Sequence, residues 1–171
     1  EMIHPFERYN GIVGRIIVQM ALRDIANEPL LLICLSEYLY HNKNEYFDLL
    51  QTTQYSGGYI RWIKFFVDAI GKAAKRSAQL LIQYEAIVAK DKKHLKDIRL
   101  LPKSVWIVYD YLKIFPVTSI SHAAKQLGSS FNSISMAVHI LSENGIVIQK
   151  NDNVRNRIWE YASLASLFIQ E

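Results

Sequence analysis

The first half of the chain has a hydrophobic pattern that predicts helices almost throughout. Residues 11–27 are apolar at nearly every position, and the polar residues Arg15, Gln19 and Arg23 recur every four positions as one stripe. A helix that is apolar on almost all sides is typical of the centre of a helical bundle. We therefore expect this segment to be a central, buried helix.

Further helices are expected downstream, separated by residues that favour helix ends. Pro29 opens a helix at roughly 30–41, because proline is favoured in a first helical turn. A third helix, at roughly 44–55, ends at Ser56-Gly57-Gly58, where glycines suit a helix stop. A much longer helix is predicted from residue 59 to about residue 95.

The long helix carries a heptad seam, in which apolar and small residues alternate spacings of four and three. The seam consists of Ile63, Val67, Ile70, Ala74, Ser77, Leu81, Tyr84 and Val88. Two interpretations remain open: the helix packs this seam on its own domain, or it forms a homodimer with a second copy. The charge run at 90–97 is expected to be a solvated helix end and linker, and Pro102 marks a boundary. The predicted domains are residues 1–97 and 98–171.

After Pro102 the pattern changes to short elements. An amphipathic helix at 103–115 is followed by a short helix, which Ser119 or Ser121 caps and Gly128 ends, and by a helix at about 130–143. The inward residues of these helices are expected to be Val105, Val108, Leu112 and Phe115, then Ala123, Ala124 and Leu127, then Ile134, Ala137, Val138 and Leu141.

A β-hairpin and a last helix are expected to close the chain. Asn144-Gly145 turns the chain into a strand at 146–149, and a turn at 151–153 leads to a returning strand at 157–161. The last helix is predicted at 163–170. Helix, helix, turn, helix and hairpin is the order of a winged helix, a helix-turn-helix variant with a small β-hairpin wing. The expected fold class is therefore mainly α.

Composition supports a folded protein in a reducing compartment. Half of the 171 residues are hydrophobic, and the single cysteine, Cys34, lies inside an apolar run, where it is expected to be a small buried hydrophobe. No apolar run is long enough to span a membrane and no signal peptide is visible, so we expect a cytoplasmic protein. Glu1 is an unusual first residue, which indicates that upstream sequence is missing.

Charge distinguishes the two halves of the chain. Residues 1–89 contain nine Lys/Arg and nine Asp/Glu, whereas residues 90–171 contain eleven and seven, so the second half accounts for the whole net charge of +4. A basic second half is compatible with binding to nucleic acid.

The stretch from His4 to Arg15 carries candidate chemistry for a phosphate group. Asn10-Gly11 leads straight into a helix, and the free N–H groups and the dipole of a helix N-terminus attract phosphate. Arg15 adds a fork-shaped donor for phosphate oxygens. His4, on the approaching loop, has the near-neutral pKa of a general base that deprotonates a hydroxyl. A structural role for His4 is the alternative.

The same stretch resembles the signature of the Fic family, which reads His-Pro-Phe-x-Asp/Glu-Gly-Asn-Gly-Arg-x-x-Arg. The matching residues are His4, Pro5, Phe6, Asn10, Gly11 and Arg15. The stretches 30–38, 42–50 and 62–66 also resemble the sequence that follows this motif in long bacterial Fic proteins, and Arg155-Asn156-Arg157 with Tyr161 resembles the wing of their C-terminal winged helix. The resemblance thus implies a Fic-type helical bundle fragment followed by a winged helix-turn-helix domain.

Membership of this family implies a protein adenylyltransferase, which moves AMP from ATP to a Ser, Thr or Tyr hydroxyl of a target protein with the help of Mg²⁺. The resemblance makes His4 the general base and Phe6 an apolar anchor of the loop. Asn10 and Gly11 would line the phosphate cradle together with Gly14, and Arg15 would bind the terminal phosphates. The target protein is unknown.

Three residues depart from the family pattern. Arg8 stands at the acidic position that holds Mg²⁺, and a cation there opposes the metal. Tyr9 replaces a glycine, which would force a different turn if that backbone needs a positive φ. Ile12 replaces the first arginine and removes a phosphate contact. We therefore predict that AMP transfer is degenerate or inactive and that no metal ligand is retained.

The winged helix supplies a second candidate site, for DNA. Serine and asparagine of the predicted recognition helix can bond phosphates or base edges, and basic residues around them can contact the backbone. The candidates are Lys125, Ser130, Asn132, Ser133, Lys150, Arg155 and Arg157. Two alternatives to the enzyme therefore remain: a DNA-binding transcriptional regulator, and a dimerising pseudoenzyme scaffold whose winged helix contacts protein.

Overall fold

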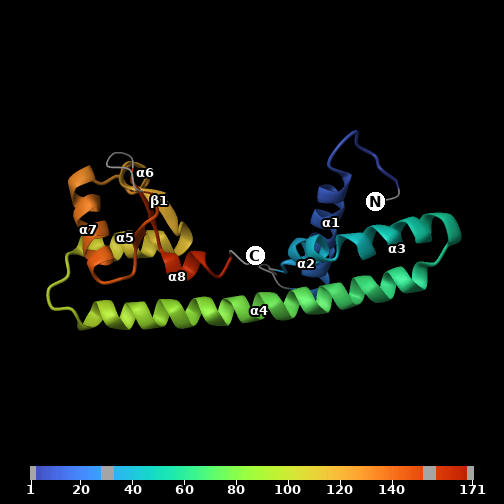
Figure 1. Cartoon of the computed structure of the whole chain (residues 1–171), viewed down its shortest axis with the longest axis horizontal. Helices are drawn as coiled ribbons and strands as arrows, with labels where there is room; N and C mark the ends of the chain where they lie inside the picture. The colour runs from blue at the N-terminus through green and yellow to red at the C-terminus, as the bar shows by residue number, and fades with distance from the viewer. Residues whose placement is uncertain (1–2, 28–32, 152–156, 169–171) are drawn as a thin grey trace. The chain divides into compact units, whose positions relative to one another are not determined.

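The computed structural model describes residues 3–27, 33–151 and 157–168, and it is mainly helical with a small antiparallel sheet (Figure 1). The elements in chain order are α1 (Asn10–Ala26), α2 (Leu35–His41), α3 (Lys43–Ser56), α4 (Tyr59–Asp97), α5 (Lys103–Ile114), β1 (Val117–Ser119), α6 (Ile120–Gln126), α7 (Phe131–Glu143), β2 (Ile148–Gln149), β3 (Ile158–Glu160) and α8 (Ala162–Ala165). No helix in the described ranges is long and apolar enough to cross a membrane.

The chain forms two compact units, residues 1–80 and 81–171, and their boundary falls inside α4. The sequence places the domain boundary at 97/98 instead. The difference arises because the second half of α4 belongs to the core of the second unit. Leu95 is fully buried there, and Tyr84, Ile87 and Val88 pack against the same cluster. The charge run at 90–97 is therefore the last part of a packed helix and not a linker.

The first unit has a small core that α2, α3 and α4 build. Its buried residues are Leu35, Leu39, Tyr46, Ala69 and Ala73. An aromatic group from α4, consisting of Trp62, Phe65 and Phe66, packs against this core. Cys34, expected to be buried, is half-exposed at the start of α2, where its backbone N–H donates to Ser77 Oγ at 3.0 Å.

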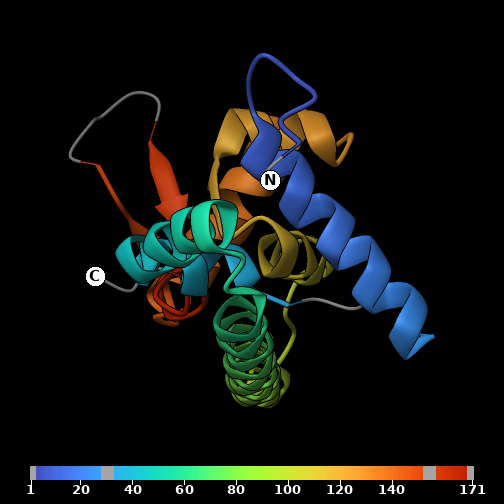
Figure 2. The ribbon, with the colours of Figure 1, turned by 90° about the vertical axis from the view of Figure 1, so that its right-hand side faces the viewer.

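Helix α1 was expected to be buried at the centre of the bundle, and it is not. None of its residues is buried, and the side chains of Ile16, Ile17 and Met20 are more than half exposed. Val18 packs against the core, and Gln19 Nε2 donates to the carbonyl of Ile33 at 2.6 Å. Figure 2 shows α1 reaching away from α2 and α3 toward its C-terminal end. An apolar helix needs neighbours on every side, and the described part of this unit covers α1 on one side only.

The heptad seam of α4 is divided between covered and exposed positions. Ile70 and Ser77 are half-buried in the first unit, and Tyr84 and Val88 are half-buried in the second. Ile63, Val67 and Leu81 are more than half exposed. The interpretation that the seam packs within its own chain is therefore confirmed for part of the seam only. The homodimer stays a prediction.

The second unit joins helices α5, α6 and α7 to a sheet with the strand order β1-β3-β2. The central strand β3 pairs with both edges, so that Glu160 lies opposite Val117 on one side and Ile148 on the other. The sequence did not predict β1, which consists of Val117, Thr118 and Ser119 directly after Pro116.

The inward faces of the helices in the second unit follow the predicted pattern closely. All four residues predicted for α7 are buried, as are Val105, Val108 and Leu112 of α5. Phe115 is the exception, because α5 ends at Ile114 and the ring of Phe115 is 54% exposed. Ser119 is the cap of α6, since its Oγ accepts from the backbone N–H of His122 at 3.2 Å.

The turn at Asn144-Gly145 is formed as expected, but the last helix is shorter than predicted. Gly145 has a φ of 71°, a left-handed conformation that glycine adopts without strain, and it leads from α7 toward β2. Helix α8 ends at Ala165 rather than at residue 170, and residues 169–171 lie outside the described ranges. The turn expected at 151–153 lies largely outside them as well.

Candidate functional site

The loop that precedes α1 is closed by the side chain of Asn10. Its Oδ1 accepts from the backbone N–H of Phe6 at 3.0 Å, and its Nδ2 donates to the carbonyl of Phe6 at 2.7 Å. Both ends of the amide are thus used within the loop, so Asn10 fixes the backbone that carries His4 toward α1. Asn10 was expected to line a phosphate cradle, but its side-chain amide is bonded to the backbone of Phe6.

The backbone at Tyr9 is left-handed, a conformation that glycine adopts more readily than a residue with a side chain. Tyr9 has a φ of 67° and is the N-cap of α1, without a side-chain cap hydrogen bond. The left-handed region is costly for a residue with a Cβ and favours glycine. Tyr9 is thus a non-glycine residue with a positive φ directly before α1, and whether its turn differs from that of the family stays a prediction.

The N-terminus of α1 has the backbone features that favour an anion. The first residues of a helix, here Asn10 and Gly11, have no carbonyl within the helix to accept their backbone N–H groups. The first turn contains no acidic residue. The partial positive charge of the helix dipole is therefore not offset by a carboxylate of this turn.

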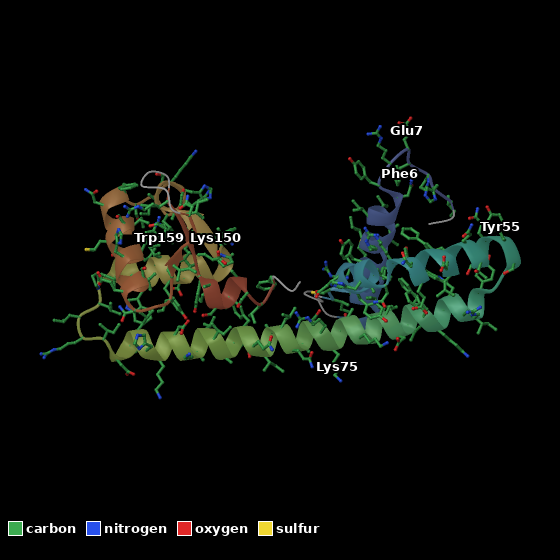
Figure 3. All side chains as sticks on the ribbon, in the orientation of Figure 1. Phe6, Glu7, Tyr55, Lys75, Lys150 and Trp159 are labelled. Carbon is green, nitrogen blue, oxygen red and sulfur yellow. The ribbon has the colours of Figure 1, made fainter. Side chains whose placement is uncertain are left out.

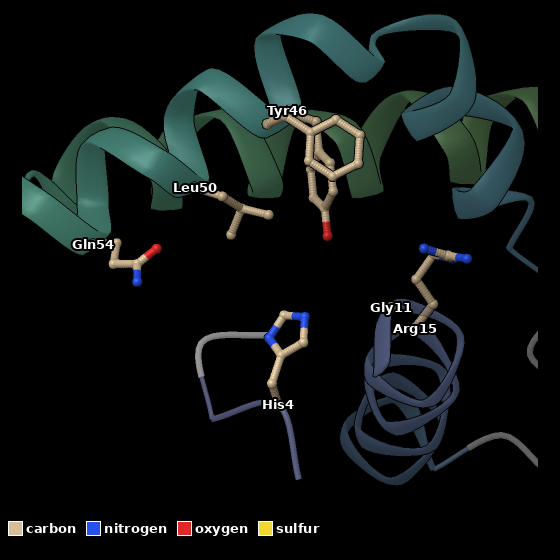
Figure 4. A pocket seen from close by; sticks show the side chains of 7 residues that line it. His4, Gly11, Arg15, Tyr46, Leu50 and Gln54 are labelled. Carbon is tan, nitrogen blue, oxygen red and sulfur yellow. The ribbon is translucent and has the colours of Figure 1, made fainter. Parts of the chain in front are cut away.

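A pocket of about 430 Å³ lies where this helix end faces α3 in the first unit (Figure 4). Its lining consists of His4, Gly11, Arg15, Tyr46, Phe47, Leu50 and Gln54. Figure 4 shows the imidazole of His4 and the guanidinium of Arg15 on one side, with the hydroxyl of Tyr46 pointing between them from α3. The described residues that line the cavity supply an imidazole, a guanidinium, a phenol and a carboxamide, and no carboxylate.

Three of the six predicted active-site residues come together in this pocket, namely His4, Gly11 and Arg15. Gly14 is half-buried in α1 and does not line the cavity. Phe6, expected to be an apolar anchor of the loop, is 55% exposed in the part of the chain that the structure describes. Figure 3 shows Phe6 and Glu7 at the outer end of the loop.

The wall of the pocket that α3 supplies was not predicted from the sequence. Tyr46, Leu50 and Gln54 follow one another at intervals of four, which places them on one face of a helix, and Phe47 lies beside them. This spacing was the available signal. The spacing alone did not indicate a binding site, because the sequence does not show that this face of α3 is turned toward the motif.

The residues at the pocket do not fit a Mg²⁺ ion. Magnesium is bound through carboxylate, phosphate and water oxygens in near-octahedral geometry. Arg8 stands at the family's metal position and is exposed, as is Glu7. Within the described ranges, no three His, Cys, Asp or Glu side chains form a group that could hold a metal ion.

The DNA-binding candidates of the second unit are only partly grouped. Ser130, Asn132 and Ser133 lie together at the start of α7, where Ser130 Oγ accepts from the backbone N–H of Ser133 at 3.3 Å. Lys125 is exposed on α6.

The basic residues at and near β2 and β3 differ in how far their charge is available. Lys150 forms an ion pair with the buried Glu160 at 2.6 Å, so its charge is largely offset within its own sheet. Arg157 is half-buried. Arg155 lies outside the described residues.

No family model and no curated protein matches the chain.

Proposed function

We propose that the first unit is a Fic-type nucleotide-binding unit in which the AMP-transfer chemistry is degenerate. The observation that supports this most is the pocket that His4, Gly11 and Arg15 share at the start of α1. A guanidinium beside an open helix N-terminus is a suitable arrangement for the phosphates of a nucleotide. The volume of about 430 Å³ is within the range of small-ligand pockets.

The same geometry argues for weak catalysis. In AMP transfer, a base removes the proton of the target hydroxyl, whose oxygen attacks the α-phosphorus of ATP while the bond to pyrophosphate breaks. His4 lines the pocket and is suited to the first task. The second requires neutralisation of charge on the leaving pyrophosphate, for which the family uses a metal and two arginines. Arg8 and Ile12 replace the metal ligand and the first of these arginines, so we expect little or no transfer.

Replacing Arg15 by glutamine is expected to weaken ATP binding by about tenfold or more, because a charge-assisted hydrogen bond to phosphate contributes about 1.5–3 kcal/mol. Isothermal titration calorimetry of the whole chain measures this. Arg23→Gln is the matched control, since it removes the same charge from an exposed position of α1 that does not line the pocket. Equal losses in both variants would show that net charge alone is responsible, and absence of binding to the unsubstituted chain would refute the proposal.

A second candidate function, DNA binding by the second unit, is supported by its topology. The order α5-β1-α6-α7-β2-β3 with the sheet order β1-β3-β2 is the arrangement expected of a winged helix, in which the second helix of the helix-turn-helix enters the major groove. Here this helix is α7, with Asn132, Met136 and His139 exposed. It carries no Lys or Arg, so phosphate contacts would come from around it.

If the second unit binds DNA, Lys125→Ala and Arg157→Ala should each weaken binding at low salt and reduce the slope of log affinity against log salt by about one. Fluorescence anisotropy with a labelled duplex measures both. Lys113→Ala is the control, because that ammonium is already paired with Asp110 at 2.7 Å. Salt-independent binding, or variants that behave like the control, would favour a protein-contact role for the winged helix.

A further inference from the structure

We infer that the outer face of α4 in the first unit docks an amphipathic helix of another protein, one that carries carboxylates along one edge. This surface, the outer stripe, runs along the side of α4 that the core of the unit leaves uncovered. Its residues are Ile60, Ile63, Val67, Gly71, Ala74 and Ala78. None of them lines the pocket at His4, so the inference does not rest on the proposed nucleotide site.

The outer stripe lies opposite the face of α4 that builds the core of the first unit. Ala69 and Ala73 are at most 2% exposed, and 3.6 residues per turn place them on one side of the helix. The stripe residues recur at intervals of three and four on the other side. The large members Ile60, Ile63 and Val67 are 71%, 55% and 63% exposed. Single exposed apolar side chains are ordinary, whereas a contiguous row of them is typical of an interaction site.

Gly71 is the second argument, because the fold of the chain does not require a glycine there. The residue lies inside α4, and a Cβ built on it meets no heavy atom of the described surroundings within 4 Å. Glycine destabilises a helix interior relative to alanine, and alanine would fit here without a clash. A second helix that approaches α4 closely accounts for the glycine, since the distance between packed helices depends on the side chains at their contact.

The charges beside the outer stripe indicate the chemistry of the partner. One edge of the stripe carries an exposed row of four cations, namely Arg61, Lys64, Lys72 and Lys75. Figure 3 shows Lys75 pointing away from α2 and α3. Asp68 lies in the same row and pairs with Lys72 at 2.7 Å, so four cations and one carboxylate leave a net charge of +3. A helix with Glu or Asp along the facing edge complements this row.

A helix from another protein fits this surface better than a second copy or a lipid bilayer. A second copy offers no row of carboxylates, because residues 59–80 contain only Asp68. A bilayer favours large apolar side chains along the whole stripe, whereas the second half consists of Gly71, Ala74 and Ala78. At 1.5 Å per residue the stripe is about 27 Å long, which matches a partner helix of about 20 residues.

The test selects helical peptides of about 20 residues from a display library on the immobilised whole chain. The library keeps one face of Leu and Ala constant and varies both edges among Glu, Gln and Lys. We expect the selected peptides to carry Glu along one edge, and a synthetic peptide of that sequence to bind more weakly as salt is raised. Selection without a preference for Glu would overturn the inference.

Gly71→Leu tests the close approach of the partner. The added side chain meets open space in the free chain, so the midpoint of thermal unfolding should stay the same or rise. Affinity for the selected peptide should fall by about tenfold or more, because the leucine occupies the contact. Gln51→Leu is the control, since it adds a leucine at an exposed position of α3 and should leave the affinity unchanged. Unchanged affinity in Gly71→Leu would place the peptide elsewhere and refute the docking face.

Reversing the row of cations tests the charge of the partner. Lys64→Glu combined with Lys75→Glu should weaken binding of the Glu-edged peptide by about tenfold or more and strengthen binding of a Lys-edged counterpart. Arg23→Glu combined with Lys43→Glu is the control, because it makes the same change in net charge at exposed positions of α1 and α3. Equal losses in the two double variants would show that net charge alone is responsible, against the role given to the row.

Two further measurements decide between the occupants of the outer stripe. Analytical ultracentrifugation that shows a dimer of the whole chain, dissociated by Gly71→Leu, would assign the stripe to a second copy. Flotation with vesicles of phosphatidylglycerol and phosphatidylcholine, strengthened by Gly71→Leu because the leucine inserts into lipid, would assign it to a membrane surface. We expect neither result, and either one would overturn the inference.

Discussion

Replacing Trp62 by alanine is expected to lower the free energy of unfolding of the first unit by about 3 kcal/mol, at the lower end for truncation of a tryptophan because the ring is only half-buried. The ring is the centre of an aromatic group, with centroids 5.1 Å from Phe66, 5.4 Å from Tyr46 and 6.2 Å from Phe65. The core beneath it is small, so little other burial compensates for the loss.

The same variant should also weaken ligand binding, because the ring of Tyr46 loses one of the two aromatic neighbours that hold it against the pocket. Far-UV circular dichroism in urea measures the stability. Trp62→Phe should recover most of it. Ile60→Ala, on the same helix and at a position 71% exposed, should change it by less than about 0.5 kcal/mol. Equal effects of Trp62→Ala and Ile60→Ala would contradict the role given to the aromatic group.

The contrast between α7 and α1 shows which part of the fold was predictable from the sequence. Helix α7 has a polar face and an apolar face, so its periodicity alone identified Ile134, Ala137, Val138 and Leu141 as buried. Helix α1 is apolar nearly all round, so periodicity gave no direction, and burial was expected on all sides. Where a helix is placed depends on its neighbours, which its own pattern does not contain.

The strand β1 was missed for a different physical reason. Three residues are too short for alternation to show, and β1 exists because β3 supplies its hydrogen-bonding partners from 40 residues further along the chain. Pro116 cannot continue the helix before it, and the β-branched Val117 and Thr118 after it were the remaining signal.

The candidate site was predictable on one side only. His4, Gly11 and Arg15 could be predicted to lie together, because a loop and the helix that directly follows it are close in space. The opposite wall comes from α3, and Tyr46 lies more than 30 positions from Arg15. Tyr9 shows a further limit, because a positive φ of 67° could not be predicted for a residue that has a Cβ.

The second half of α4 belongs to the second unit, and polar contacts that the sequence pattern does not reveal help to hold it there. Tyr161 donates from its hydroxyl to Asp91 Oδ2 at 2.6 Å, and Tyr109 donates to the carbonyl of Val88 at 2.9 Å. Both tyrosines are buried, and their ring centroids lie 6.0 Å apart. Asp91, within a run that looks like solvated surface, is thus a hydrogen-bond partner for the core of the second unit.

This buried pair should make the second unit sensitive to alkali. Burial, and then the hydrogen bond to Asp91, raise the pKa of Tyr161 far above its usual value of 10.0, and burial raises the pKa of Tyr109 as well. In the folded state both phenols therefore stay protonated at a pH where the unfolded chain releases their protons. The stabilisation is complete below about pH 10 and falls above it, by about 1.4 kcal/mol per pH unit for each tyrosine.

Replacing Tyr161 by phenylalanine should lower the free energy of unfolding of the second unit by about 2 kcal/mol at neutral pH, because a hydrogen bond to a carboxylate is lost inside the protein. Above pH 10 the variant should lose stability about half as steeply as the unsubstituted chain, since only Tyr109 still contributes. Urea unfolding at pH 7 to 11, followed by the fluorescence of Trp106 and Trp159, measures both effects. Tyr55→Phe is the control, because Tyr55 is 78% exposed in the first unit and should alter neither quantity. A Tyr161→Phe variant that retains the full alkaline slope would show that this phenol does not stay protonated in the folded unit.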